Sequence, residues 1–536
     1  MKKGIWKSDW LVGLLITLVF LVFSDSDFLQ GLERTAYDFS VRSSTRIPSD
    51  RLAVIAIDDE SIANIGRWPW PRDVHAQILE ILTEGGARVI GQTVFFSEPQ
   101  IDPGLHFISE LRLAFENSSI AAVPESVADL EMVVKASRKL VRNKRDANGR
   151  SAIDQISEYL AKSPLKTRVA EEIDSYIKVL ASAEVALDTD IKLGESIALA
   201  NNVVLAMPFI PGSQLGPADE DLPDYVRANK LPEDNITDKA KMNPDGPGPI
   251  SMVNTYAPIA AVGEAAIGIG ALVSIPDVDG GIRSEPLLVD YYGDYFPSMA
   301  LLLAAKSLNL TVNDIHAEFG NSVSLGRLNI KTDDRSLMNT FFYSDESGKQ
   351  AFPVDSFFDV LQGKIPASKY KDKLVLIGAT AIGIGDSMVT PINPSMAPVL
   401  TLAHSVSSIL NEDFLIQPSW GMYATLGAFV LVALHLMLAL PRMSSVVGFT
   451  ITALLFIIFF SCEYIMMTKH GVWIKLMLPN MLLIGGHLLL TTKHFLVAER
   501  GKARLDIESA ENNRMLGLSM QGQGQLDMAL EKFRKL

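Results

Sequence analysis

Two indoles and a guanidinium lie close together in the sequence, at Trp68, Trp70 and Arg72, with a proline after each indole. Proline fixes its own φ and disfavours helix in the residue before it, so the indoles should project from a rigid, extended backbone. In one interpretation they form an aromatic lip on a ligand pocket, and Arg72 binds an anion through its planar fork of donors. In the other, the indoles fill the core, and Arg72 caps a helix or pairs with Asp58 or Asp59.

Four aspartates are further candidates for ligand binding. Asp58 and Asp59 directly follow an apolar run at 52–57, and open α/β sheets bind ligands beyond the carboxyl ends of their strands. Either residue could equally be the N-cap of the next helix. Asp279 lies in an Asp-rich turn, but an EF-hand needs a longer ligand series and a terminal glutamate, so a plain turn is favoured over a cation loop. Asp386 is likewise expected in a turn first and as a pocket carboxylate second.

Catalytic signatures are missing from the sequence. It contains no Walker loop, no G-x-S-x-G elbow, no H-E-x-x-H zinc motif and no kinase motif set. Its single cysteine, Cys462, excludes a disulfide framework and a cysteine-rich zinc site. The formal net charge of −14 argues against a nucleic-acid partner, which requires a basic face. We therefore predict no catalytic residues, no metal site and no cofactor.

The apolar pattern predicts that a mixed α/β domain positions these candidate residues. Apolar runs at 52–57 and 88–96 flank a helical pattern at 75–84, and such a unit normally forms a parallel strand pair. Further strands are expected at 202–209, 324–330, 340–343 and 374–377, with a hairpin over 282–296. Within 105–197, long charged segments without glycine or proline predict a helical insertion, packed on the core or on a partner. The proline-rich segment 211–249 is expected to be an irregular surface loop.

The chain is more apolar than a soluble globule of its size normally is, with 48% hydrophobic residues and a mean hydropathy of +0.21. The surplus lies in blocks long enough to cross a bilayer. One block covers 10–23 and follows three lysines, and three more lie at 421–440, 446–467 and 472 to about 490. A cleaved signal peptide is the alternative for the first block. No small-residue cleavage site follows it, so an uncleaved anchor is expected.

Positive charges assign the sides of the membrane. Lysines precede the first block, and basic residues from Lys493 to Arg504 follow the last, so both ends are expected in the cytoplasm. The predicted parts are a first transmembrane helix within 1–23, an extracytoplasmic α/β sensor domain at 24–419, a three-helix transmembrane bundle at 420–493 and a cytoplasmic tail at 494–536. Four transmembrane helices are thus expected, one N-terminal and three C-terminal. Glu463 and the histidines of these blocks keep a transporter open as an alternative.

The tail is predicted to continue as a helix over 495–515 and then to form part of a tetratricopeptide-like repeat. The spacing of Leu516, Gly517, Ala529 and Phe533 fits one such repeat. A single repeat cannot bury its own apolar face, because about three are needed for stability. The tail is therefore expected to continue into, or to dock onto, an output module.

Several motifs together resemble one known family. They are the run at 57–61, Gly-Arg-Trp-Pro-Trp-Pro-Arg at 66–72, Phe-Phe-Ser-Glu-Pro at 95–99, Pro-Asp-Val-Asp-Gly at 276–280 with Arg283, Phe-Pro-Ser at 296–298, and the glycine-rich stretch from 376 to His404. Over about 28–415 the chain resembles the type-two CHASE domain, the cyclase- and histidine-kinase-associated sensory extracellular domain. Gln92 departs from the pattern, because the family usually has an aspartate there. The tail from 509 onward resembles the juxtamembrane segment of bacterial serine/threonine kinases that carry this sensor.

The resemblance implies a transmembrane signal receptor in the bacterial inner membrane, with its large domain in the periplasm and Arg283 among its candidate ligand-binding residues. An unknown small molecule or protein would bind the outer domain. The signal would pass through the segment before Trp420 to a serine/threonine kinase or adenylate cyclase module that this chain does not contain. A homo-oligomer is expected, because relative motion of subunits is the simplest route across a bilayer. The alternative is a structural or assembly protein that forms a larger oligomer through its outer domain.

Overall fold

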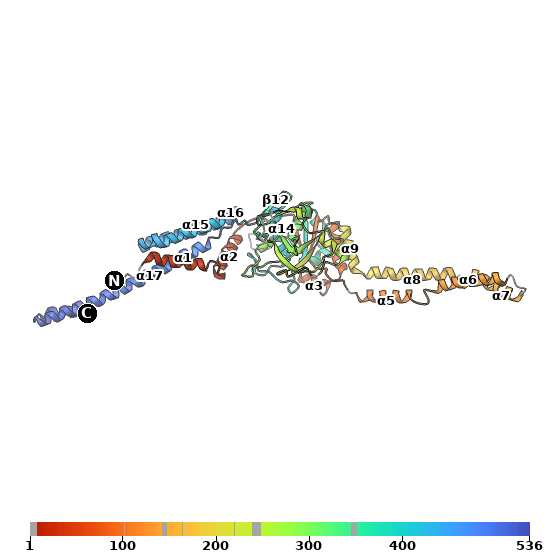
Figure 1. Ribbon diagram of the computed structural model, residues 1–536, viewed down its shortest axis with the longest axis horizontal. Helices are drawn as coiled ribbons and strands as arrows, with labels where there is room; N and C mark the ends of the chain where they lie inside the picture. The colour runs from red at the N-terminus through yellow and green to blue at the C-terminus, as the bar shows by residue number, and fades with distance from the viewer. Residues whose placement is uncertain are drawn as a thin grey trace.

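The protein is elongated, with a globular body between two helical extensions (Figure 1). The computed structural model describes residues 8–100, 102–141, 147–162, 165–218, 220–237, 248–344 and 351–535. A helical arm leaves the body at one end, and a bundle of long helices followed by the tail leaves it at the other. Body, bundle and tail therefore follow one another along the long axis.

A nine-stranded sheet forms the centre of the body, in the order β14-β1-β15-β2-β3-β5-β8-β9, with β6 also paired to β3. Its middle is parallel and consists of β1 (Leu52–Ile57), β15 (Leu374–Ala379), β2 (Val89–Gln92) and β3 (Val203–Pro211). Parallel strands are covered on both faces, which is why these segments are continuous apolar runs. The four runs predicted as buried strands are strands, although β2 is shorter than its run.

The first strand–helix–strand unit does not form the adjacent pair that was predicted. β15 lies between β1 and β2 and pairs in parallel with both. The connection through α4 (Arg72–Glu84) therefore crosses the width of one additional strand. Apolar patterning indicates that a strand is buried on both faces but does not identify the strand beside it. The pattern therefore could not predict that β15 lies between β1 and β2.

Helices cover both faces of the sheet. Alternate residues of β1 face a core shared with α12 (Met299–Ser307) and α14 (Pro398–Asn411), and the others face a core shared with α4 and α9 (Thr189–Ala200). This three-layer arrangement confirms the predicted α/β class. The short helices of the body are α3 (Asp59–Ile65), α10 (Asp224–Arg227), α11 (Ala260–Gly263) and α13 (Phe357–Leu361).

Smaller strands complete the body. The central sheet also contains β5 (Ile250–Thr255), β6 (Gly268–Leu272), β8 (Leu288–Tyr291), β9 (Asp294–Pro297) and β14 (Val354–Ser356). A second sheet contains β4 (Ile236–Thr237), β10 (Ile315–Glu318), β11 (Ser322–Leu325) and β12 (Leu328–Lys331), and a separate pair is β7 (Ser284–Pro286) with β13 (Leu337–Asn339). The predicted hairpin is confirmed as β8 and β9, whose turn residues Tyr292 and Gly293 both have positive φ. The segment 324–330 is two strands of a hairpin instead of one strand, because the chain turns at Gly326.

Residues 340–343 are not a strand, contrary to the prediction. β13 ends at Asn339, and the backbone beyond it bonds to side chains of α14. The Phe341 N–H donates to Ser408 Oγ at 3.0 Å, and the Tyr343 N–H donates to His404 Nδ1 at 3.1 Å. The segment is therefore buried, as its apolar residues indicate, without a neighbouring strand.

The predicted insertion is helical, and most of it forms the arm. The arm contains α5 (Pro103–Glu116), α6 (Val123–Val141), α7 (Ala147–Lys162) and α8 (Leu165–Leu187), whereas α9 returns to the body and packs on α4. The arm extends away from the body rather than packing on it (Figure 1). Part of the predicted loop 211–249, at 219 and 238–247, lies outside the described residues.

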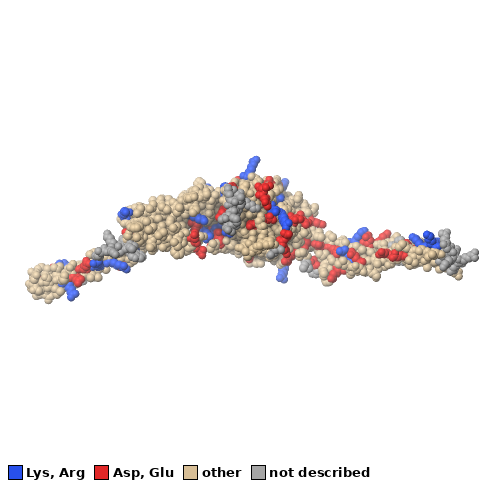
Figure 2. Space-filling model, viewed as in Figure 1, with Lys and Arg blue, Asp and Glu red and all other residues tan. Residues whose placement is uncertain are grey.

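Three C-terminal helices are long and apolar enough to cross a membrane: Gly421–Arg442, α16 (Ser445–His470) and α17 (Met477–Gly522). The first is α15 (Gly421–Leu434) extended by a π-helical turn, η6 (His435–Ala439), and a 3-10 turn, η7 (Leu440–Arg442). The third begins later than predicted, because the chain at 472–473 is extended and pairs with Ile416. Figure 2 shows that the bundle surface is largely free of charged side chains in this view, as a lipid-facing surface requires.

The N-terminal block is part of a bent helix pair. α1 (Asp9–Val22) and α2 (Asp27–Arg42) meet at 79°. The 14 residues of α1 span about 21 Å, less than the ~30 Å apolar core of a bilayer. The structure therefore contains three candidate spans, or four if the bent pair counts as one, and a first transmembrane helix stays a prediction.

The tail ends in a short helical hairpin. α17 continues beyond the bundle to Gly522, and α18 (Leu526–Phe533) folds back against it. A Cβ on Gly517 would lie 2.7 Å from the Phe533 ring, so a glycine is needed for this close approach. The contact joins residues that the tetratricopeptide-like spacing had singled out.

Candidate functional site

A cavity of about 790 Å³ opens where the parallel strands of the body end. Residues directly after β2, β6 and β15 line it, and the first turn of α14 closes one side. Open α/β sheets bind ligands at this edge, and the volume suits a small molecule. Most of the lining is apolar, including the rings of Trp68, Phe95 and Phe209.

The two predicted indoles have different positions. Trp68 lines the cavity, as the pocket interpretation requires. Trp70 is 2% exposed and lies in the core, where its Nε1–H donates to the Gly66 carbonyl at 2.9 Å. The ring centroids are 5.1 Å apart at an interplanar angle of 75°, so the core indole supports the indole at the cavity.

Arg72 lines the cavity, but its charge is already compensated. Its Nε donates to Asp190 of α9 at 3.1 Å, and one terminal nitrogen donates to the Glu98 carbonyl at 3.0 Å. The guanidinium also lies 4.7 Å from the Phe96 ring centroid. The expected pairing with Asp58 or Asp59 is wrong, because the partner comes from the distant helix that follows the arm. These contacts leave Arg72 poorly suited to hold an anion by itself.

Asp58 and Asp59 do not line the cavity. Asp58 is the N-cap of α3 and accepts from the Ser61 N–H at 2.8 Å and from Ser356 Oγ at 3.0 Å. Asp59 is exposed in the first turn of α3, where a carboxylate suits the helix dipole. The N-cap interpretation therefore describes Asp58, and ligand binding by either residue gains no support from its position.

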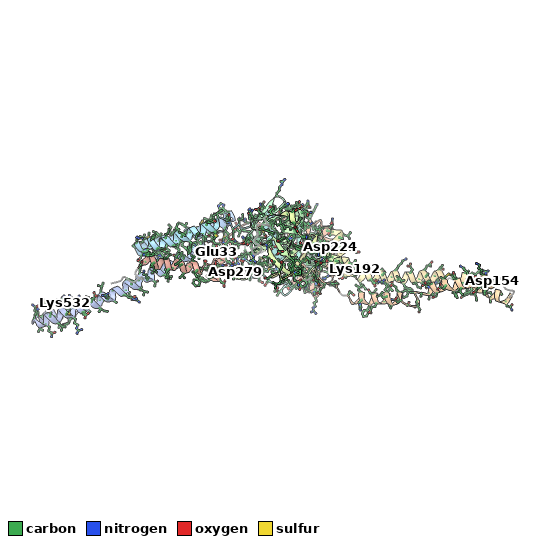
Figure 3. The ribbon with its side chains drawn as sticks, in the orientation of Figure 1. Glu33, Asp154, Lys192, Asp224, Asp279 and Lys532 are labelled. Carbon is green, nitrogen blue, oxygen red and sulfur yellow. The ribbon has the colours of Figure 1, made fainter. Side chains whose placement is uncertain are left out.

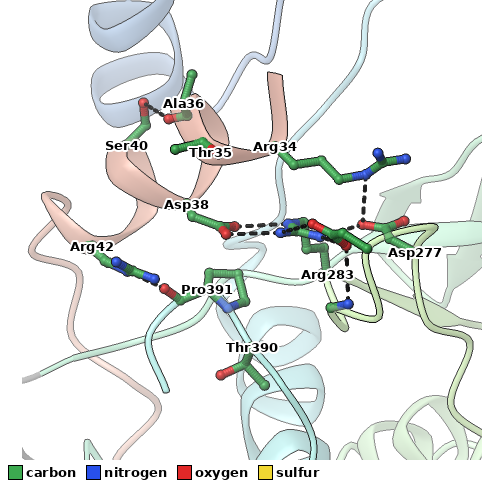
Figure 4. A network of polar contacts seen from close by, with 12 residues as sticks. Arg34, Thr35, Ala36, Asp38, Ser40, Arg42, Asp277, Arg283, Thr390 and Pro391 are labelled. Carbon is green, nitrogen blue, oxygen red and sulfur yellow. Dashed lines mark hydrogen bonds and ion pairs between the residues drawn. The ribbon is translucent and has the colours of Figure 1, made fainter. Parts of the chain in front are cut away.

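Asp386 is exposed and lines the cavity. Asp279 and Arg283 belong to a separate ion cluster. Figure 4 shows Arg283 of this cluster between Asp38 and Asp277. Arg283 is 7% exposed, and its donors bind Asp38 of α2 at 2.8 and 2.9 Å, Asp277 at 2.8 Å and Asp279 at 2.9 Å. Burial alone would lower the pKa of this guanidinium, but the three carboxylates raise it above its usual range. The turn at 277–280 thus binds an arginine instead of a cation. No cluster that could hold a metal occurs among the described residues.

The sequence did not single out the polar residues that face the inside of the cavity. Glu285 on β7 accepts from Ser405 Oγ at 3.1 Å, and burial raises the pKa of its carboxyl to about 7. Thr401 of α14 is 5% exposed, and its hydroxyl has no hydrogen-bond partner among the described residues. His75 is 1% exposed, and burial lowers its pKa to about 3, so the ring is neutral. These residues come from segments far apart in the chain, and no local motif marks them.

Gln92 lies behind the cavity wall. Its Nε2 is 3.4 Å from His75 Nδ1, while its Oε1 has no partner among the described residues. The residue is fully buried at the end of β2. A carboxylate at this position, as in the usual family pattern, would bury a charge beside the apolar face of α4, whereas the amide avoids that cost.

The ionisable side chains of the membrane helices lie apart from the cavity. Glu463 is 2% exposed and contacts Glu33 of α2, a partner that the sequence did not suggest. His435 and His487 approach the Thr452 hydroxyl at 3.4 and 3.0 Å. Both sets of contacts join helices to one another.

One family comparison bears directly on this architecture. The family model described as the CHASE2 domain matches residues 13–440, which include the whole body, most of α1, all of α2 and nearly all of the first C-terminal span. The chain belongs to the CHASE2 domain family. The predicted resemblance is thereby confirmed, and with it the assignment of the body to an extracellular sensor domain family. No curated protein and no solved structure matches this chain.

Replacing Glu285 by glutamine is expected to reduce the pH dependence of stability. The folded-state pKa of about 7 lies above the reference value of 4.5, so the folded chain keeps a proton that the unfolded chain loses between these pH values. Wild-type stability should therefore fall as pH rises through this window, by up to about 3 kcal/mol, and the Glu285→Gln chain should fall less. Thermal unfolding of both full chains in nanodiscs on either side of the window measures the difference.

Asp221→Asn is a suitable control, because the Asp221 side chain is 99% exposed. This variant should follow the wild type at every pH. Equal pH dependence in wild type and Glu285→Gln would contradict the buried, protonated state of Glu285.

Proposed function

We propose that this chain is a bacterial membrane receptor whose body binds a signal in the cavity and whose α17 carries the response to a cytoplasmic output module. The output would be a serine/threonine kinase or an adenylate cyclase, whose motifs these residues lack. One observation carries the proposal: a continuous series of contacts joins the cavity to the start of α17 through α2. A signal is transmitted only if the ligand binds two arrangements of this series with different affinity.

The first step of the series leads from the cavity to the ion cluster. Glu285 lines the cavity two residues after Arg283. Met388 also lines the cavity, and its neighbour Val389 accepts from the Ile282 N–H at 2.7 Å. A ligand that moves either wall of the cavity therefore acts on the segment that holds Arg283.

The second step crosses from the body to α2. Arg283 holds Asp38 in a two-point ion pair, and Arg42, one turn further along α2, donates to the Pro391 carbonyl (Figure 4). Asp38 and Arg283 are almost withdrawn from water, with side chains 17% and 8% exposed. Such a pair resists separation, because an unpaired buried charge costs several kcal/mol.

The third step joins α2 to the membrane bundle. Glu33 accepts from Trp473 Nε1 at 3.0 Å and from the Met477 N–H at 3.2 Å, so α2 caps the first residue of α17. The Tyr37 and Trp473 ring centroids are 4.7 Å apart. Figure 3 shows Glu33 and Asp279 at the end of the body that faces the bundle. The segment before Trp420, predicted as the relay, supplies a second route to the bundle, because the Trp473 N–H donates to the Ile416 carbonyl at 2.9 Å.

The proposed topology has four crossings, with α1 as the first and both ends in the cytoplasm. Lys493 binds Asp9 at 2.6 Å, which supports placing the start of α1 and the exit of α17 at the same end of the bundle. The body is at the opposite end (Figure 1). Basic residues from Lys493 to Arg504 favour the cytoplasm for the shared end, and this orientation puts the body in the periplasm.

Topology reporters should distinguish the two sides. A periplasm-specific reporter inserted after Gly320, in an exposed turn, is expected to be active, and the same reporter after Gly522 is expected to be inactive. A cytoplasm-specific reporter should give the opposite pattern. Activity of both insertions on the same side would contradict the receptor topology.

Filling the cavity should change the hydrogen exchange of the first turn of α17, but only while the Asp38–Arg283 ion pair is intact. Ser274→Trp places an indole at the cavity mouth, and Ser368→Trp is its control at an exposed serine away from the cavity. We expect Ser274→Trp to change hydrogen exchange at the start of α17, and a coupling of about 1 kcal/mol would appear as a roughly fivefold change in protection. Asp38→Asn should abolish this response, and Asp38→Glu should keep part of it. If Ser274→Trp changed hydrogen exchange at α17 equally in the Asp38→Asn chain, α2 would not be part of the relay.

The proposal includes a homo-oligomer that forms through the arm. All described side chains of α5, α6, α7 and α8 are at least partly exposed. The apolar residues that are more than half exposed include Phe107, Leu111, Val133, Tyr176 and Val179. Two antiparallel helices cannot bury apolar residues on their outer sides, whereas a second pair would complete a bundle. Copies in the same membrane would hold their arms at the same height, which favours a symmetric pairing of arm with arm.

Tyr176→Lys together with Val179→Lys should weaken this association. Both residues lie on one exposed flank of α8. Two lysines there would lie close to the same two lysines of the second copy, and their positive charges would repel. Asp174→Lys adds a lysine to the other flank and serves as the control. Cross-linking of the full chain in vesicles should show less dimer for the double variant only. Equal dimer in all three chains would exclude the arm as the interface.

A further inference from the structure

We propose that the cavity binds a small molecule with an apolar, preferably aromatic body and a protonated amine, with the amine at Glu285 and Thr401. The inference rests on the proposed function, because it takes the cavity as the signal site, and it adds the chemical class of the signal. Three features of the lining carry it: the balance of charge, the acceptor oxygens of Glu285 and Thr401, and the aromatic wall.

The charge balance disfavours an anionic ligand. Arg72 is the lining guanidinium, and Asp190 already compensates it at 3.1 Å. His75, the other basic type in the lining, is neutral, since it is buried among aromatic rings. Two lining carboxyl groups, Glu285 and Asp386, have no lysine or arginine partner among the described ion pairs. An anion would therefore find no uncompensated cation in the lining and would meet the carboxylate of Asp386, whereas a cation would be attracted.

The helix end beside the cavity does not reverse this balance. The first turn of α14 lines the cavity, and helix N-termini usually attract anions through their free N–H groups. Here the first residue is Pro398, which has no N–H, and the N-cap Ala397 has no side chain that could help. The turn instead presents Thr401.

Glu285 and Thr401 both contribute acceptor oxygens to the lining of the cavity. Ser405, one helical turn after Thr401, donates to one carboxyl oxygen of Glu285 at 3.1 Å, and the same carboxyl also hydrogen-bonds to the Ser298 side chain. Thr401 Oγ1 is buried without a partner among the described residues. An ammonium has three donors and no acceptor, so it can satisfy the hydroxyl and the carboxylate together. Its charge would also favour the ionised form of Glu285, which burial otherwise disfavours.

The remaining lining suits the rest of such a molecule. Trp68, Phe95 and Phe209 contribute rings to a mainly apolar wall. Aromatic faces attract cations and also pack against aromatic or aliphatic groups. The cavity of about 790 Å³ can hold a molecule with one ring and a short chain.

Three probes of similar size test the class: 2-phenylethylamine, 2-phenylethanol and phenylacetate. Binding to the full chain in nanodiscs is measured by saturation-transfer NMR and by thermal shift. We expect 2-phenylethylamine to bind, 2-phenylethanol to bind at least about tenfold more weakly and phenylacetate not to bind, since an ion pair to a charged group contributes more than a neutral hydrogen bond.

Variants identify the group that recognises the amine. Glu285→Gln should weaken the binding of 2-phenylethylamine at least about tenfold and leave the affinity for 2-phenylethanol unchanged. The unchanged affinity for the alcohol also verifies that the cavity is intact. Thr401→Val should weaken both polar probes slightly, and Ser274→Trp should weaken them strongly. Asp221→Asn, the exposed control carboxylate, should change neither.

The outcomes separate this inference from the proposed function. Preferential binding of phenylacetate, equal binding of amine and alcohol, or an amine affinity that survives Glu285→Gln would overturn the amine class while leaving the cavity as a signal site. Binding of no probe would also overturn the class. If, in addition, Ser274→Trp left α17 unchanged, the proposed receptor function would fail with it.

Discussion

The structure depends on one buried arginine. Arg283 is 7% exposed and is held by carboxylates of two separate chain segments, Asp38 on α2 and the pair Asp277 and Asp279 in the turn just before it. A guanidinium at this depth is stable only with its charge compensated and its donors used. The requirement ties the body to α2, which also contacts α16 and α17 of the bundle. Asp277 also lies 3.7 Å from Arg34 of α2, which extends the cluster along the same helix.

The sequence predicted the features that depend on burial alone. The strands of the sheet centre are buried on both faces, so their apolar runs identify them regardless of neighbours. The helical arm is equally clear, because long charged helices carry their own periodicity. The adjacency of β15 to both β1 and β2, by contrast, depends on a strand from far along the chain. The segment 340–343 looks like a strand because it is apolar, yet its backbone partners are side chains of α14.

The candidate site was predicted in part, and for a similar reason. Trp68, Arg72 and Asp386 line the cavity, and a recognisable motif or turn marks each of them. Glu285 and Thr401 have ordinary neighbours in the sequence, and only the fold brings them together. Asp279 and Arg283 were candidates for ligand binding, but the structure uses them to hold Asp38, which lies 245 residues from Arg283 in the chain. Pairwise charge contacts over such separations leave no local signal, so neither the Arg72–Asp190 contact nor the Arg283–Asp38 contact could be predicted.

The bend between α1 and α2 explains why a single ion pair can matter for the whole bundle. Because α2 turns by 79° from α1, it lies across the end of the bundle nearest the body instead of continuing along it, and it touches both α16 and α17. The ring centroids of Phe39 on α2 and Tyr464 on α16 are 6.0 Å apart. Glu33 of α2 accepts a hydrogen bond from the first backbone N–H of α17. The body holds α2 at Asp38 and α17 holds it at Glu33, and only five residues, less than two turns, separate these two contacts. This short spacing is what the proposed relay through α2 requires. The 46 residues of α17 form one helix, so in the proposed relay no break separates its first turn from the tail.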